Sequence, residues 1–173
     1  SIVFLKGTRY LTYNLVQSIL LAVLVISILM AFLFQSFRMI LFAVITNLIP
    51  LIFTAGFMGW IGVTIKPSTI LVFSIAFGIS VDDTIHFLAK YKLAIKKSGD
   101  NIQTIISTIK DVGSSMFYTS IALFLSFIIF IFSDFQGTKA LGFLLSFTLL
   151  IAMFANLIFL PALLMLKKEK KHD

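Results

Sequence analysis

The chain has 173 residues, of which 60 % are hydrophobic and only 12 % charged, and its mean hydropathy is +1.09. A soluble domain is nearer half apolar and a quarter charged. The composition therefore excludes a disordered chain, a nucleic-acid-binding domain and a soluble globule, and it predicts an integral membrane protein. The absence of cysteine excludes disulfides, cysteine-ligated metals and thiol catalysis in this chain.

Five segments are long and apolar enough to cross a membrane, since a span needs about 20 mainly apolar residues. They comprise residues 15–34, 39–62, 68–88, 116–133 and 140–164. These apolar runs are continuous rather than alternating, and lipid tolerates no unpaired backbone, so the spans are predicted to be helices. The predicted fold is all-α, a polytopic membrane bundle of five transmembrane helices.

One further helix is predicted between the third and fourth spans, at about residues 100–112. Apolar residues recur there at helical spacing, namely Ile102, Ile105, Ile106, Ile109 and Val112. Asp100, with Gln103 three residues later, fits a capping box at its start. The pattern is typical of an amphipathic interfacial helix on the cytosolic surface of the membrane, and a helix that docks a partner is the alternative.

Lysine and arginine are divided unevenly between the two ends of the predicted bundle. Ten lie at one end, in the first and third connections between spans and in the C-terminal tail, and four lie at the other. The positive-inside rule therefore places the N-terminus outside and the C-terminus in the cytosol. Residues 1–14 are predicted to end an extracytoplasmic region, residues 15–166 to form the transmembrane domain, and residues 167–173 to be a basic cytosolic tail. The chain begins at Ser1, and we expect it to be a piece of a longer one.

Two acidic residues, Asp82 and Asp83, lie inside the third span, in the run FGISVDDTIHFL. An ionised aspartate at mid-span costs about 2.5–3.5 kcal/mol on insertion scales, and such residues usually mark an ion or proton path. His86 follows at positions that share their helical face, and an imidazole beside a carboxylate exchanges protons near neutral pH. We predict that the three residues form a proton relay. The alternatives are that the acids only join helices and that His86 is interfacial.

Other uncharged residues within the spans are predicted to support this relay or to join helices by hydrogen bonds, namely Asn47, Tyr118, Thr119 and Asn156. Gly78, one turn before Asp82, is predicted to allow close helix packing, as are Gly56 and Gly59. No lysine or arginine lies within a predicted span, so no cation is expected beside the acids. The sequence contains no phosphate-binding loop, metal-ligand cluster or Ser–His–Asp spacing, so we expect neither an enzyme nor a metal or organic cofactor.

The run KPSTILVFSIAFGISVDDTIHFLAKYK resembles the fourth-helix motif of the RND superfamily of transporters, especially its MMPL and Patched-like branch. The motif is carried here by Gly78, Val81, Asp82, Asp83, Ile85 and His86. The runs NLIPLIFTAGFMGWIGVTI and NLIFLPALL resemble the preceding and the closing helices of the same block, so the resemblance covers nearly the whole chain. Many relatives have an acid where Asn156 stands, so the resemblance does not carry a second relay position over to this residue.

The resemblance implies that the chain is one five-helix block, from the C-terminal half of a protein with two similar halves and large extracytoplasmic domains. It implies export of lipids or other hydrophobic compounds, driven by a proton gradient that Asp82 and Asp83 would couple, with sodium as the other candidate ion. The implied partners are the bilayer, the hydrophobic or lipid substrate, the N-terminal half and the extracytoplasmic domains, and a homo-oligomer stays open. We expect a multi-pass protein of the cell membrane, in a bacterium the inner membrane. A lipid- or sterol-sensing module without transport activity is the main alternative, and a scaffold subunit is the third.

Overall fold

The computed structural model of the chain describes residues 2–64 and 66–166, and nearly all of them are helical. The helical elements, in chain order, are α1 (Ile2–Phe34), α2 (Phe37–Ile61), α3 (Pro67–Ser98), α4 (Asn101–Thr108), η1 (Ile109–Gly113), α5 (Ser114–Ile128), η2 (Ile129–Phe132), α6 (Gln136–Phe154), η3 (Ala155–Phe159) and α7 (Leu160–Met165). Five stretches are long and apolar enough to span a membrane, and they are Val16–Phe34, Phe37–Ile61, Thr69–Ser98, Asn101–Phe132 and Gln136–Met165. The predicted all-α bundle of five spans is confirmed. The predicted basic tail of residues 167–173 lies outside the described residues.

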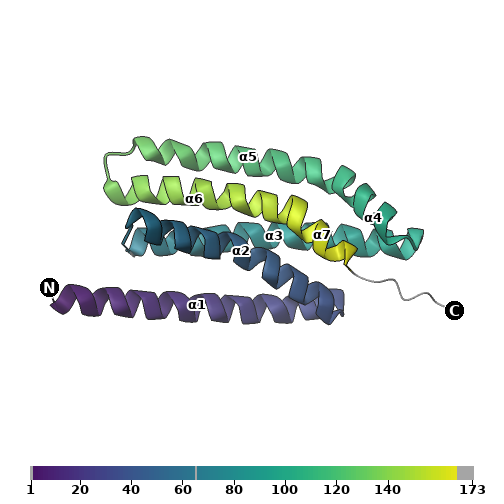
Figure 1. The fold of residues 1–173 in the computed structure, drawn as a ribbon, viewed down its shortest axis with the longest axis horizontal. Helices are drawn as coiled ribbons and strands as arrows, with labels where there is room; N and C mark the ends of the chain where they lie inside the picture. The colour runs from purple at the N-terminus through teal and green to yellow at the C-terminus, as the bar shows by residue number, and fades with distance from the viewer. Residues whose placement is uncertain (1, 65, 167–173) are drawn as a thin grey trace.

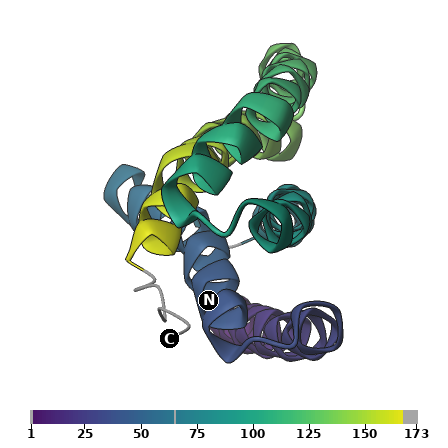
Figure 2. The same cartoon turned by 90° about the vertical axis from the view of Figure 1, so that its right-hand side faces the viewer.

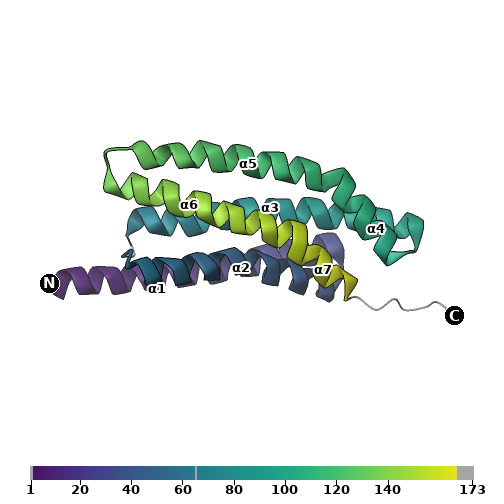
Figure 3. The same ribbon diagram turned by 45° about the horizontal axis from the view of Figure 1, so that its top comes forward.

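The helices lie side by side along one long axis, with the N-terminal end of α1 and the C-terminal end of α7 at opposite ends of the molecule (Figures 1 and 3). In the end-on view, α1 and α5 lie at the two extremes, and α3 lies between them against α2 and α6 (Figure 2). Two apolar clusters fill the space between these helices. One is built around Val72, Phe73 and Leu145, and the other around Phe87 and Leu160.

Two helices extend further than the span pattern predicts. The helix α1 begins at Ile2, so residues 2–14, predicted as the end of an extracytoplasmic region, are helical and continue directly into the first span. The helix α3 runs to Ser98, ten residues beyond the predicted end of the third span at residue 88. It ends where Gly99 adopts a left-handed conformation with φ of 70°, which glycine tolerates best. The apolar pattern missed this extension because lysines interrupt it while the backbone remains helical.

The helix predicted between the third and fourth spans is present, but it is not a separate element. Asp100 caps its start, because its side chain accepts a hydrogen bond from the Ile102 backbone N–H at 3.0 Å. The helix then continues without a break through the π-helical turn η1 into α5. Its buried side is partly polar and includes Thr104 and Thr108, while Ile102 and Ile106 are exposed. This segment therefore packs against α3 and α7 and forms the first part of the fourth stretch of spanning length, Asn101–Phe132.

The helices are tied together at the end of the bundle that we name the lysine-rich end, defined by Arg38, Lys90, Lys92, Lys96, Lys97 and Lys110. The Lys92 ammonium of α3 donates a hydrogen bond of 2.8 Å to the Leu33 carbonyl oxygen in the last turn of α1. It also lies 5.9 Å from the centroid of the Phe34 ring. Carbonyls in the last turn of a helix have no partner within the helix and attract cations. Lys92 therefore fixes the end of α1 against α3.

Candidate functional site

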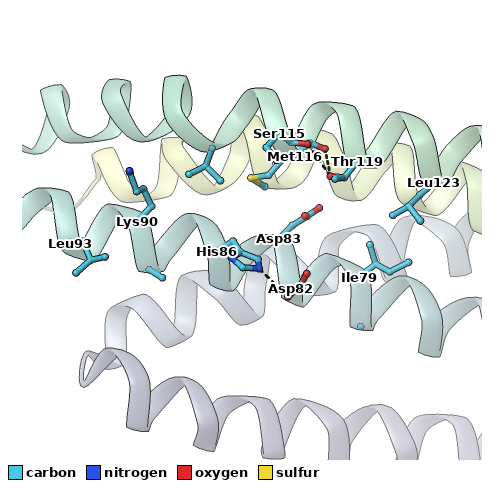
Figure 4. Close-up of a pocket in the computed structure, with 13 residues that line it drawn as sticks. Ile79, Asp82, Asp83, His86, Lys90, Leu93, Ser115, Met116, Thr119 and Leu123 are labelled. Atoms are coloured by element: carbon cyan, nitrogen blue, oxygen red, sulfur yellow. Dashed lines mark hydrogen bonds and ion pairs between the residues drawn. The ribbon is translucent and has the colours of Figure 1, made fainter.

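A groove of about 750 Å³ runs between α3 and the α5 side of the bundle, and we name it the acid groove (Figure 4). Its α3 wall is formed by Gly78, Ile79, Asp82, Asp83, His86, Ala89, Lys90 and Leu93. Its other wall is formed by Val112 of η1 and by Ser115, Met116, Thr119 and Leu123 of α5. The groove exists because α5 packs along α6 and leaves a space on the side that faces α3.

The three residues predicted as a proton relay share this groove. The Asp82 Oδ1 lies 3.5 Å from the His86 Nε2, as their spacing of four residues on one helix allows. Their side chains are 72 % and 69 % exposed, so they point out of the five-helix block rather than into its core. Asp83 is partly buried and points across the groove toward Ser115 and Thr119 of α5 (Figure 4). The structure thus gathers two carboxylates and an imidazole at the middle of a 32-residue helix.

A cation also lines the acid groove, contrary to the prediction that the bundle offers none. Lys90 lies in α3, one turn beyond His86, and its Nζ lies 3.1 Å from the Oδ2 of Asp111 in η1. Both side chains of this ion pair are about half exposed, at 46 % and 52 %. The sequence pattern places Lys90 beyond the end of the third span, because the apolar run ends at Leu88, and it places Asp111 in the predicted interfacial helix. The available signal was the spacing of Asp82, His86 and Lys90, which is four residues at each step.

Of the two supporting residues predicted on α5, Thr119 lies at the acid groove and Tyr118 does not. Thr119 lines the acid groove, and its hydroxyl donates to backbone carbonyls of its own helix at 3.0 Å for Met116 and 3.1 Å for Ser115. Tyr118 lies outside the groove lining, and its side chain is exposed beside the ring of Phe117. Tyr118 therefore does not line the acid groove.

The glycines predicted to allow close helix packing are not used in that way within the described part of the chain. A Cβ atom added at Gly56, Gly59 or Gly78 would meet no other atom within 4 Å. Gly78 instead borders the open acid groove. The tightest approach occurs at Gly142 of α6, where an added Cβ would lie 2.6 Å from the Phe130 Cβ.

The two predicted asparagines lie on the opposite side of α3, in a buried set that we name the polar cluster: Asn47, Ser80, Thr84 and Asn156. The Asn47 Oδ1 accepts a hydrogen bond from the Ser80 hydroxyl at 2.6 Å, and the Thr84 hydroxyl lies 3.0 Å from the same oxygen. The Thr84 hydroxyl also lies 2.6 Å from the Asn156 Oδ1. These contacts join α2, α3 and η3.

The polar cluster and the acid groove cannot share side chains, because residues two apart on a helix point in nearly opposite directions. Ser80 and Thr84 each lie two residues from Asp82 and face the core, and Asp82 therefore faces outward. Asn47 and Asn156 thus hold α3 in place rather than contact the acids. The helices are locally irregular around both asparagines. Asn156 lies in the π-helical turn η3, and Pro50 follows Asn47 by one turn in α2.

The chemistry available in the acid groove is proton exchange. An imidazole nitrogen within reach of a carboxylate can pass a proton to it or accept one from it. Among the described residues, no group of three or more His, Cys, Asp or Glu side chains has the arrangement of a metal site.

Comparison with known proteins agrees with this architecture. The profile of the MMPL family matches residues 3–171, which is nearly the whole chain. No curated protein matches the chain. Together with the five helices of spanning length, the match identifies a multi-pass membrane protein. The acid groove thus lies in the helix bundle of a chain that is a member of the MMPL family.

Proposed function

We propose that the chain is the membrane part of an exporter of lipids or other hydrophobic compounds, driven by the proton gradient, in which Asp82, Asp83 and His86 relay the protons. The observation that carries this proposal is the gathering of these three side chains in one groove at the middle of an apolar helix. Ionisable residues within a membrane carry a free-energy cost of insertion, and they usually mark a functional site. Members of the MMPL family are transporters, which supports the same reading.

The acid groove needs a covering other than hydrocarbon in the working protein. Asp82 and His86 point out of the five-helix block, and an ionised aspartate facing lipid at mid-span costs about 2.5–3.5 kcal/mol. Water or another protein surface removes this cost. We propose that the other half of the transporter, which is N-terminal to this chain, covers the groove together with its extracytoplasmic domains. In a homo-oligomer, a second copy of this chain would serve the same purpose.

A proton cycle in the groove would move α3 through electrostatic repulsion. With both carboxylates ionised, Asp82 and Asp83 repel each other, and uptake of one proton removes that repulsion. The proton can pass between the Asp82 Oδ1 and the His86 Nε2, which are 3.5 Å apart. Because the polar cluster ties α3 to α2 and η3, a displacement of α3 would carry both neighbours with it. Such a concerted displacement would couple protonation to the substrate path.

The direction of coupling follows from the proposed orientation. The lysine-rich end carries most of the positive charge of the described bundle, which supports its placement in the cytosol. Protons would then enter the groove from the opposite, outer side and leave toward the lysine-rich end while substrate is exported. This orientation places the protein in a cell membrane, in a bacterium the inner one.

The test is gradient-driven transport in inside-out vesicles from cells that make the protein, with N-phenylnaphthylamine as a fluorescent hydrophobic probe. Imposing a pH gradient should drive probe transport, and Asp82→Asn together with Asp83→Asn should reduce it to the level of vesicles without the protein. Asp134→Asn, the same chemical change in an exposed loop, should leave transport unchanged. Retained transport in the double variant would contradict the relay, and transport driven by a sodium gradient alone would assign sodium as the coupling ion.

A second candidate function is lipid sensing without transport, and one feature favours it. An almost wholly apolar cavity of about 470 Å³ lies between α1, α2 and α3, and it is lined by Val16, Ile19, Leu48, Leu51, Ile52, Ala55, Met58, Gly59, Val63 and Phe73. Its size and lining suit an acyl chain or a sterol ring system. Saturable lipid binding at this cavity together with no transport under any ion gradient would favour the sensing module.

A further inference from the structure

The acid groove is adjoined at the lysine-rich end by a second, smaller cavity. This second cavity, of about 290 Å³, is lined by Lys90, Leu93, Ala94, Lys97 and Asp111. Lys90 and Leu93 line both cavities and thus form the partition between them. The ion pair of Lys90 with Asp111, 3.1 Å long, lies at this partition and joins α3 to η1 across it.

The two ends of the acid groove differ in polarity. The end away from the partition is formed by Gly78, Ile79 and Leu123, and none of these residues is polar or charged. At the other end, the charged Lys90 and Asp111 meet a cavity that also contains Lys97. Water and ions enter polar openings far more readily than apolar ones in a membrane. The partition is therefore the favoured entrance for water to the acids, on the side toward which the protons are proposed to leave.

We propose that the ion pair of Lys90 with Asp111 is a gate between the acid groove and the aqueous phase at the lysine-rich end. The two side chains come from opposite walls, so their contact closes the entrance and their separation opens it. Both are about half exposed, and an ion pair of that exposure biases a closed state by no more than about fivefold. Such a pair is weak enough to open often.

The surroundings of the gate favour reversible opening. Asp111 lies in the π-helical turn η1, and such turns are local irregularities that recur at functional sites. Lys97, which lines the second cavity, offers Asp111 another cation when Lys90 withdraws. The other charged or titratable groups that line the groove beside Lys90 are Asp82, Asp83 and His86, all on α3, whereas the α5 wall contributes only uncharged residues. Lys90 is thus placed between acids on both sides of the partition.

The role of the gate rests on the proposed function, since a proton relay requires a controlled exit. Access through the gate can nevertheless be measured without any transport. The chain has no cysteine, so Ser115→Cys, a substitution of one atom in the groove wall, introduces a single thiol within it. Vesicles that expose the lysine-rich end would be treated with membrane-impermeant methanethiosulfonates, one cationic and one anionic. The protein without Ser115→Cys gives the background rate.

The gate predicts that Lys90→Met and Asp111→Asn each raise the reaction rate of Ser115→Cys by about two- to fivefold for both reagents, the range expected for a half-exposed ion pair. The exchanged pair, Lys90→Asp with Asp111→Lys, should return the rate to within about twofold of the original. Both reagents must respond in the same direction, because a change in local charge alone would raise one rate and lower the other. Ser107→Cys, exposed on α4 outside both cavities, should react equally in every background.

Unchanged rates in both single variants, or opposite responses to the two reagents, would overturn the gate. These outcomes are independent of the transport experiment. If the gate variants raise access while Asp82→Asn with Asp83→Asn leaves transport intact, the gate stands and the relay fails. If access is unaffected while the aspartate variants abolish transport, the relay stands and the gate fails.

Discussion

Thr84→Val is the substitution whose cost follows most directly from the polar cluster. The Thr84 hydroxyl lies 2.6 Å from the Asn156 Oδ1 and 3.0 Å from the Asn47 Oδ1, and it has one proton to donate. Valine has nearly the same shape, so the change removes this hydroxyl with little change in packing. Asn47 keeps the Ser80 hydroxyl as a donor at 2.6 Å, whereas Asn156 loses the donor that Thr84 supplied to its oxygen.

The expected loss of stability is about 1–2 kcal/mol. A hydrogen bond between membrane helices contributes about 0.6 kcal/mol on average and about 1.7 kcal/mol at most. A buried acceptor left without its donor costs about 1–3 kcal/mol of stability in soluble proteins. The cost is smaller in a membrane protein, because groups of the unfolded state that remains in the membrane also find hydrogen-bond partners. The effect should lie between these two scales.

The assay is unfolding in mixed micelles with increasing mole fraction of dodecyl sulfate, followed by circular dichroism. Thr119→Val is the matched control, because its exposed hydroxyl bonds only to carbonyls of its own helix, and its cost should stay below about 0.5 kcal/mol. If Thr84→Val destabilises the protein no more than Thr119→Val does, the polar cluster does not hold α3, and the proposed transmission of its movement fails.

Two further substitutions test the packing. Gly142→Ala should cost about 1–3 kcal/mol of stability in the same assay, because the added Cβ would lie 2.6 Å from the Phe130 Cβ. Gly59→Ala adds its Cβ in open space and should cost nothing. Equal effects of the two substitutions would refute this contrast. Lys92→Met should cost about 0.5–1 kcal/mol and speed limited proteolysis near the end of α1, because it removes the bond to the Leu33 carbonyl. Unchanged cleavage would show that α1 does not depend on this contact.

The gathering of the two acids and the histidine on one side of α3 was predictable because it depends only on local geometry. Asp82, Asp83 and His86 are close in sequence, and any helix places them on one side. The direction of that side was not predictable from these residues alone. It is set by Ser80 and Thr84, whose hydroxyls are buried against Asn47 and Asn156 and thereby turn the acids outward. Residues of the same motif thus supply both the three ionisable side chains and the contacts that orient them.

The opposite wall of the groove was only partly predictable, since the hydroxyl residues of α5, among them Ser115, Tyr118 and Ser120, fall on several sides of the helix. A helix without a polar stripe does not reveal from its sequence which side faces its neighbours. The packing of α5 on α6 decides that Thr119 lines the groove and that Tyr118, the adjacent residue, does not. The close contact at Gly142 likewise depends on the approach of η2, which glycine spacing within one helix cannot indicate.

Lys90 and Asp111 were missed for a different physical reason. The extent of a span was judged by the length of its apolar run, and lysine ends such a run. A lysine with a long apolar stem can nevertheless lie on a membrane helix with its ammonium directed toward the interface. The helix α3 therefore continues through Lys90, and the ion pair with Asp111 forms at the mouth of the groove.

The measurement that tests the central claim most directly is reverse coupling in proteoliposomes of the purified protein. A steep gradient of N-phenylnaphthylamine is imposed without a pH gradient, and the internal pH is followed with a trapped fluorescent indicator. Because coupling between two fluxes is reciprocal, downhill movement of the probe should drive protons in the opposite direction. We predict this proton flux in the protein and in Asp134→Asn, and its loss in Asp82→Asn with Asp83→Asn. Proton flux that persists undiminished in the double variant would contradict the assignment of these carboxylates as the relay.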